Sequence, residues 1–135
     1  MPHDSIVPGC PEDWLRHAKS DLDLSFVDKP DSVLWESLCF HAQQAAEKSL
    51  KALLLFLNRE FPRTHNIRTL LDLIARDLNI PDEIDDAAIL SDYAVTIRYP
   101  GEYNAIDEIE YTEAIRIAKR VYQWVEEIFD KQRRS

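Results

Sequence analysis

The sequence predicts an all-α protein, an up-and-down four-helix bundle with an additional short or fifth helix. Only two glycines occur in 135 residues, at Gly9 and Gly101, while alanine, leucine, glutamate, lysine and arginine are plentiful. Apolar residues recur at helical spacing in several segments, and prolines separate these segments from one another. The length fits one domain, with residues 1–10 as a flexible N-terminal segment, 11–131 as the bundle and 132–135 as a basic tail that frays.

The first predicted helix begins at Pro11 and ends near Asp28. Its apolar face comprises Trp14, Leu15, Ala18, Leu22 and Phe26. Glu12 and Asp13 fall in its first turn, where the helix dipole favours acids. Because Pro30 disfavours helical backbone in the residue before it, we expect the helix to stop two residues earlier.

The second predicted helix is capped by Asp31 or Ser32 and runs to about Asn58. Two neighbouring stripes along this helix consist of apolar or small residues. One comprises Leu38, Ala42, Ala45, Ser49, Ala52 and Phe56, and the other Trp35, Cys39, Ala46, Leu50, Leu53 and Leu57. The small residues allow another backbone to approach closely, as suits the central helix of a bundle.

The third predicted helix spans residues 67–78, with Thr64 or Asn66 as its cap. Its candidate core residues are Leu70, Leu71, Leu73, Ile74 and Leu78. A loop at residues 59–66, broken by Pro62, precedes it. The chain therefore turns sharply between the second and third helices.

The fourth predicted helix spans residues 82–99 and stops at Pro100–Gly101. Its apolar residues are Ile84, Ala88, Ile89, Tyr93 and Ile97. The last helix starts at Thr112, or earlier at Asn104, and runs past Phe129. Its apolar face comprises Ile115, Ala118, Val121, Tyr122, Val125, Ile128 and Phe129.

A polar strip interrupts the apolar pattern of the second helix. It consists of His41, Gln44, Lys48 and Lys51, which lie within about 80° of one another, with Glu47 beside them. Glu47 precedes Lys51 by four residues, a spacing at which the two side chains can form an ion pair. The strip is either a solvated face of the helix or part of a binding site or dimer surface, and the sequence leaves both open.

The charge of the chain is unevenly distributed. The formal net charge is -9, and residues 81–115 alone hold ten acids and one base, Arg98. Residues 48–68 hold five bases and one acid. An acidic average argues against avid, sequence-blind binding to nucleic acid, so any phosphate contact must be local.

Several other classes of protein and site are disfavoured. The longest purely apolar run, residues 52–57, is far short of the roughly 20 residues of a membrane span, and residues 1–10 lack a signal-peptide pattern, so we expect a cytoplasmic protein. Cys10 and Cys39 have no metal-ligand spacing and are predicted to be free thiols. We predict no metal and no cofactor, since the acids lack paired histidines or cysteines and two isolated glycines cannot build a phosphate loop.

Four segments, in order, resemble the HEPN family of small helical domains. They are HAQQAAEKSLKALL in the second helix, THNIRTLLDLI at the third, IRYPG after the fourth, and the final amphipathic helix. The resemblance covers about residues 12–130. It implies a helical bundle that binds a nucleotide or RNA, forms a homodimer and pairs with a minimal nucleotidyltransferase.

Nuclease members of this family carry an arginine followed, after four to six residues, by a histidine near the start of the last helix. Here Arg98 is followed five positions later by Tyr103, and no histidine occurs after His65. A tyrosine with a pKa near 10 is a poor general base at neutral pH. Arg59 and His65 have an allowed spacing but lie in another loop, so we discount them and expect His65 to pack or cap at the start of the third helix.

The site implied by this resemblance combines two regions of the sequence. Arg98 would contact phosphate, and Tyr99 and Tyr103 would line the dimer cleft. His41, Gln44 and Lys48 would add polar contacts from the second helix. A more ordinary explanation of Tyr93, Tyr99, Tyr103 and Tyr111 is that they are core-edge residues with polar tips.

Two alternative functions remain open. One is a toxin-like, metal-independent endoribonuclease with a degenerate motif, using Arg98, Tyr103 and His41. The other is a non-catalytic interaction subunit, in which the acidic segment 81–115 docks on a basic surface of a nucleotidyltransferase.

Overall fold

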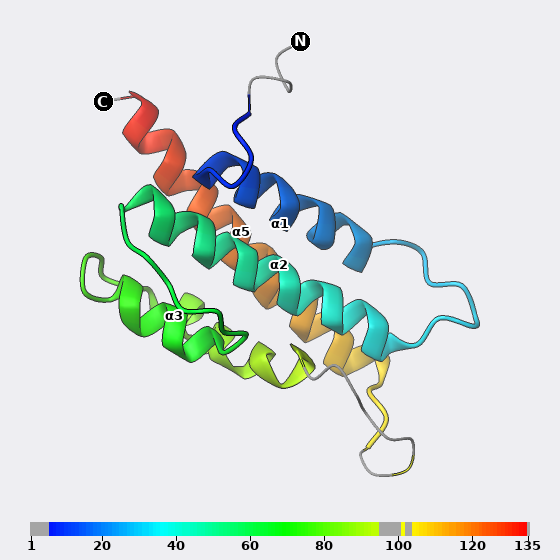
Figure 1. The fold of residues 1–135 in the computed structure, drawn as a ribbon. Coiled ribbons are helices and arrows are strands. Elements are labelled where there is room, and N and C mark those ends of the chain that lie inside the picture. The colour runs from blue at the N-terminus through cyan, green and yellow to red at the C-terminus, as the bar shows by residue number, and fades with distance from the viewer. Residues whose placement is uncertain (1–5, 95–100, 102–103, 135) are drawn as a thin grey trace.

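The described part of the chain forms six helical elements, which we present from a computed structural model (Figure 1). The structure describes residues 6–94, 101 and 104–134. The elements are α1 (Pro11–Ser25), α2 (Trp35–Phe56), α3 (Ile67–Ile74), α4 (Asp82–Asp85), the 3₁₀ helix η2 (Asp86–Ala94) and α5 (Glu108–Arg134). No strand occurs among these residues, and the predicted all-α bundle is confirmed.

Helix α2 is the centre of the bundle. Helix α1 runs antiparallel beside it, α5 packs against it in the same direction as α2, and α3 and η2 cover a further side (Figure 1). The core follows α2, where Leu50, Leu53 and Leu54 are fully buried. Near the end of α2 the ring of Phe56 stacks on that of Phe129 of α5, with 4.2 Å between the ring centroids. The predicted role of the second helix as the central one therefore holds.

Helix α1 ends at Ser25, three residues before its predicted end. The Ser25 hydroxyl donates to the carbonyl of Leu22 at 2.6 Å, and the amide of Phe26 donates to the carbonyl of Asp23 at 3.2 Å. These short-range bonds close the last turn, so Pro30 is not what ends the helix. Phe26, predicted on the apolar face of this helix, is exposed.

Helix α2 begins later than predicted. Its N-cap is Leu34, whose side chain makes no capping hydrogen bond, and neither Asp31 nor Ser32 caps it. The helix ends at Phe56, after which Asn58 adopts a positive φ of 59°. Asparagine tolerates this left-handed conformation better than most residues, which explains the sharp change of direction.

Helix α3 begins where predicted but is shorter. Asn66 is its cap, and the Asn66 side chain accepts a hydrogen bond from the amide of Arg68 at 2.9 Å. The hydroxyl of Thr64 accepts in turn from the amide of Asn66 at 3.0 Å. The helix ends at Ile74 rather than residue 78, and turns follow it.

The predicted fourth helix divides into α4 and η2. Ile84, Ala87 and Leu90 recur every third residue and are all fully buried, as three residues per turn require. The same geometry turns Ile89, one of the apolar residues of the predicted fourth helix, outward, and its exposed fraction is 63%. Residues 95–99 of the predicted helix lie outside the described part of the chain.

Helix α5 begins at Glu108, between the two predicted starts. The carboxylate of Asp107 accepts from the amide of Glu110 at 2.8 Å and thereby satisfies one of the unpaired amides of the first turn. The helix continues to Arg134 and so includes residues 132–134 of the predicted basic tail. Arg133 also reaches Glu12 at 3.5 Å, which ties the end of α5 to the start of α1.

Neither Cys10 nor Cys39 is in a disulfide, as predicted. No helix of the described ranges has an apolar stretch long enough to cross a membrane.

Candidate functional site

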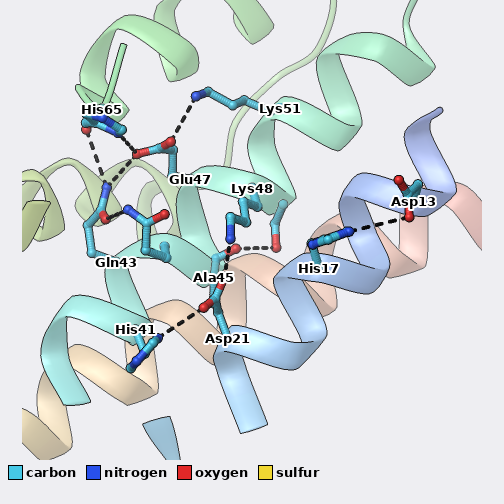
Figure 2. A network of polar contacts seen from close by, with 12 residues as sticks. Asp13, His17, Asp21, His41, Gln43, Ala45, Glu47, Lys48, Lys51 and His65 are labelled. Atoms are coloured by element: carbon cyan, nitrogen blue, oxygen red, sulfur yellow. Dashed lines mark hydrogen bonds and ion pairs between the residues drawn. The ribbon is translucent and has the colours of Figure 1, made fainter. Parts of the chain in front are cut away.

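The polar residues of α2 belong to two clusters of side chains, both drawn in Figure 2. The glutamate cluster consists of Gln43, Gln44, Glu47 and Lys51 of α2 with His65 of the following loop. The aspartate cluster consists of Asp21 of α1 with His41 and Lys48 of α2. Both clusters join α2 to its neighbours through polar contacts.

Glu47 is the centre of the glutamate cluster, with an exposed fraction of 3%. Lys51 Nζ donates to Glu47 Oε2 at 2.8 Å, and Gln43 Nε2 donates to Glu47 Oε1 at 2.9 Å. His65 Nδ1 lies 2.9 Å from the same Oε1. Burial opposes ionisation of this carboxyl, but the hydrogen bonds from Lys51, Gln43 and His65 outweigh burial and hold the pKa of Glu47 below its usual value.

Lys51 extends this cluster to an aromatic pair. Its ammonium group lies 5.7 Å from the ring centroid of Trp14 in α1 and 5.4 Å from that of Phe61 in the loop after α2. The two rings meet edge to face, with centroids 5.6 Å apart. Lys51 thus meets a carboxylate and two ring faces, so its buried charge is compensated from three elements.

Asp21 is the centre of the aspartate cluster. It is a buried residue of α1, and its two carboxylate oxygens contact different residues of α2. Lys48 Nζ donates to Asp21 Oδ2 at 2.6 Å, and His41 Nδ1 lies 3.1 Å from Oδ1. The contacts bridge α1 and α2 over about two turns of α2, the distance from His41 to Lys48 along the helix.

The structure brings part of the sequence-predicted site together. His41 and Lys48 meet through Asp21, while Gln44 joins the other cluster by donating to Gln43 Oε1 at 2.7 Å. The remaining predicted site residues, Arg98, Tyr99 and Tyr103, lie outside the described residues.

The polar strip of α2 is not a solvated face. Glu47 and Lys51 form the predicted ion pair, and both are buried. His41, Gln44 and Lys48 are partly buried and bonded to neighbouring side chains. The reason is that α1 and the loop after α2 both cover this side of the helix, which the helical period alone does not reveal.

Arg59 and His65, discounted as a catalytic pair, have separate partners. Arg59 binds both carboxylate oxygens of Asp77, with N–O distances of 2.8 and 2.7 Å. His65 contacts Glu47, although its side chain is 68% exposed. Asn66, not His65, caps α3, and the contact of the His65 ring is with Glu47 of α2.

Sequence reasoning missed Asp21 and Gln43 as members of the clusters. Asp21 follows Trp14 by seven residues and Ala18 by three, which places a carboxylate on the buried side of α1. An acid on an apolar stripe is a signal for a buried polar contact, because an isolated buried charge is costly. The signal for Gln43 is its spacing, because it lies four residues before Glu47 and the two side chains can therefore meet.

A small hollow of about 270 Å³ lies beside both clusters, between α1 and α2. Its lining consists of Gly9, Asp13, Trp14, His17 and Lys48. No group of three or more histidine, cysteine or acidic side chains in the described residues is arranged to hold a metal ion.

Comparison with known proteins identifies the family. The family model of the HEPN domain matches residues 11–128, which is most of the chain. The chain belongs to the HEPN family. The HEPN resemblance read from the four sequence segments is therefore confirmed, and so is the helical fold that it implied.

Solved structures of similar proteins share this fold. The protein TT1696 from Thermus thermophilus is 31% identical over 87% of this chain and 96% of its own, with a TM-score of 0.70. The archaeal HEPN homologue ST0689 is 32% identical over 87% and 95%, with a TM-score of 0.68. A HEPN domain protein from Thermotoga maritima, tm0613, is 25% identical over 89% and 93%, with a TM-score of 0.58. No curated protein matches the chain.

Proposed function

We propose that this HEPN protein is a non-catalytic nucleotide- or RNA-binding module that acts as a homodimer, with a minimal nucleotidyltransferase as its partner. The observation that carries the proposal is the segment RYPGEY in a HEPN chain. It keeps the arginine of the family's nuclease motif, Arg98, and has Tyr103 where a histidine would complete that motif. An arginine without the histidine of that motif suits phosphate binding better than hydrolysis.

The charges on α2 support Arg98 as the main phosphate ligand. The ammonium of Lys48 is matched by the carboxylate of Asp21, which His41 also contacts. Gln44 is neutral and bonded to Gln43. These α2 side chains therefore offer polar contacts but little uncompensated positive charge, and an anionic ligand would depend on Arg98.

Each of the described histidines contacts an acidic side chain. His17 lies near Asp13 of its own helix at 3.6 Å, His41 contacts Asp21, and His65 contacts Glu47. Each ring thus has an acidic neighbour within its own region of the bundle, and the three come from α1, α2 and the loop after α2.

The proposal is tested by titrating the purified protein with ATP and with a short single-stranded RNA. Calorimetry gives the affinity, and a gel shows whether the RNA stays intact. We expect binding without cleavage, and Arg98→Ala should weaken it about tenfold or more, because a charge-assisted phosphate contact is lost. Arg76→Ala is the matched control, since it removes one exposed arginine charge from the turn after α3.

Other outcomes would change the assignment. Equal affinity of Arg98→Ala and the wild type would show that the phosphate site is elsewhere. Cleavage of the RNA, lost in Arg98→Ala, would favour the endoribonuclease that uses Arg98, Tyr103 and His41. Failure to co-purify with a minimal nucleotidyltransferase from the same source would remove that partner from the proposal.

A further inference from the structure

Two adjoining hollows lie where η2 meets the first half of α5. The first, of about 520 Å³, has walls formed by Ile89 and Tyr93 of η2 and by Glu110 and Glu113 of α5. The second, of about 560 Å³, is formed by Glu113 together with Ile109 one turn earlier in α5. Because the hollows share Glu113, we treat them as one surface and name it the η2–α5 groove.

Two large apolar side chains are exposed at this groove. Ile89 is 63% exposed and Ile109 is 81% exposed, the largest value among the exposed large hydrophobic residues of the described chain. Ile89 points outward because the 3₁₀ geometry of η2 reserves the inward positions for Ala87 and Leu90. Single exposed apolar residues are ordinary, but two at adjoining hollows form a surface that a partner can cover.

The walls of the groove are acidic. They carry Asp86, Glu108, Glu110 and Glu113, and no lysine or arginine of the described chain lines either hollow. The nearest basic partner of these acids is Arg116, whose Nε donates to Glu113 Oε2 at 3.0 Å. Even with Arg116 included, the groove keeps a net negative charge, which selects for a positively charged partner.

We propose that the η2–α5 groove docks a basic amphipathic helix of a protein partner. The apolar face of that helix would cover Ile89 and Ile109, and its lysines or arginines would pair with Glu108, Glu110 and Asp86. A second copy of this chain is a poorer occupant, because it would bring an identical acidic rim against this one. The inference does not depend on nucleotide binding at Arg98.

The probe for the test is a synthetic amphipathic helix of about 18 leucine and lysine residues, five turns long. A peptide of the same composition, scrambled so that no apolar face forms, is the peptide control. Fluorescence anisotropy gives the affinity, and backbone amide chemical shifts locate the peptide on the protein. We expect the amphipathic peptide to bind at the groove, and to bind more weakly as salt rises.

Two variants test the two parts of the surface. Ile109→Ser should weaken binding about tenfold, because the peptide loses one apolar anchor, while its exposed position leaves folding intact. A triple variant with Asp86→Asn, Glu108→Gln and Glu110→Gln should weaken it by a similar factor and flatten its salt dependence.

Each variant has a matched control. Val7→Ser changes an apolar residue that is 65% exposed before α1. A second triple variant, with Glu126→Gln, Glu127→Gln and Asp130→Asn, removes three acids from the far half of α5. Both controls should bind the peptide as the wild type does.

Three results would overturn the inference. If the scrambled peptide binds equally well, net charge alone explains the binding. If the amide shifts are confined to another surface, the peptide binds outside the groove. If Ile109→Ser converts a dimer into monomers, the groove is an interface with a second copy of this chain. Arg98→Ala should leave peptide binding unchanged, so this test and the nucleotide titration can fail separately.

Discussion

Glu47 illustrates how this protein keeps a charge in its interior. A carboxylate that is 3% exposed would be costly alone, yet it accepts from Lys51 and Gln43 and contacts His65. Its donors come from α2 and from the loop after it, so the same residue fixes the loop against the helix. Asp21 does the equivalent between α1 and α2 through Lys48 and His41.

The lowered pKa of Glu47 predicts a specific loss of stability in acid. A depressed folded-state pKa stabilises the protein above the ordinary value of 4.5, and this contribution disappears as pH falls through the lower folded pKa. We expect Glu47→Gln to be less stable than the wild type by about 1–3 kcal/mol at pH 7, with the difference shrinking below pH 4.5. Urea unfolding at a series of pH values measures it.

Glu60→Gln is the control for this pH series, because Glu60 is exposed in the loop after α2. It should lie close to the wild type throughout. A gap between Glu47→Gln and the wild type that stays constant down to pH 3 would contradict the role given to the ionised carboxylate.

Replacing both members of the Glu47–Lys51 pair should be milder than replacing one. Glu47→Leu leaves the buried ammonium of Lys51 without its carboxylate, at a cost of about 3–5 kcal/mol. Adding Lys51→Leu removes that unpaired charge and keeps an apolar side chain against Trp14 and Phe61. A double-mutant cycle by urea unfolding measures the coupling. If the loss of stability in the double variant equals the sum of the losses in the two single variants, Glu47 and Lys51 contribute independently of each other.

At the scale of elements, the long α2 has no side-chain cap at its start, whereas the much shorter α3 has one. Helix α2 is 22 residues long and packs against α1, α3, η2 and α5. Helix α3 has eight residues, too few to be stable alone, and begins with the Asn66 cap. Its neighbour η2 adopts 3₁₀ geometry and buries every third residue against the core.

Removing the cap of α3 should have a measurable effect. Asn66→Ala loses the side-chain oxygen that accepts from the amide of Arg68, and we expect a loss of about 1 kcal/mol in the free energy of unfolding. Hydrogen exchange of the first α3 amides should also become faster. Asn79→Ala, at an exposed position before α4, is the control and should change neither. If hydrogen exchange is unchanged in Asn66→Ala, packing alone stabilises the start of α3.

At the scale of the whole molecule, ion pairing consumes most of the basic charge of residues 48–68. Lys48 pairs with Asp21, Lys51 with Glu47, Arg59 with Asp77 and Arg68 with Asp85. The basic region seen in the sequence is therefore largely neutralised in the fold, whereas the η2–α5 groove stays acidic. We therefore expect the net negative charge of the chain to govern its association with other molecules.

The proposed homodimer should become tighter as salt rises. Each chain carries a net charge of -9, so two copies repel, and salt screens that repulsion. Sedimentation at low and high salt measures the dimer dissociation constant, and we expect it to fall. A basic partner at the groove should show the opposite salt dependence. A dimer that dissociates at high salt would point to ion pairs across its interface instead.

The sequence by itself determined the features that depend on short-range spacing. Helical periodicity placed α1, α2, α3 and α5 to within a few residues, and the four-residue spacing predicted the Glu47–Lys51 pair. The Asn66 cap and the family resemblance are equally local, since both are read from short runs of residues. These features were predictable because their cause lies within one or two helical turns.

Only the tertiary structure decided the contacts between distant segments. Asp21 lies 20 residues from His41 and 27 from Lys48, and His65 lies 18 residues from Glu47. Which residues meet at such separations depends on how α1 and the loop pack on α2, and periodicity does not specify this. The outward turn of Ile89 is a tertiary feature too, because Ala87 and Leu90 are the residues of η2 that are buried in the core.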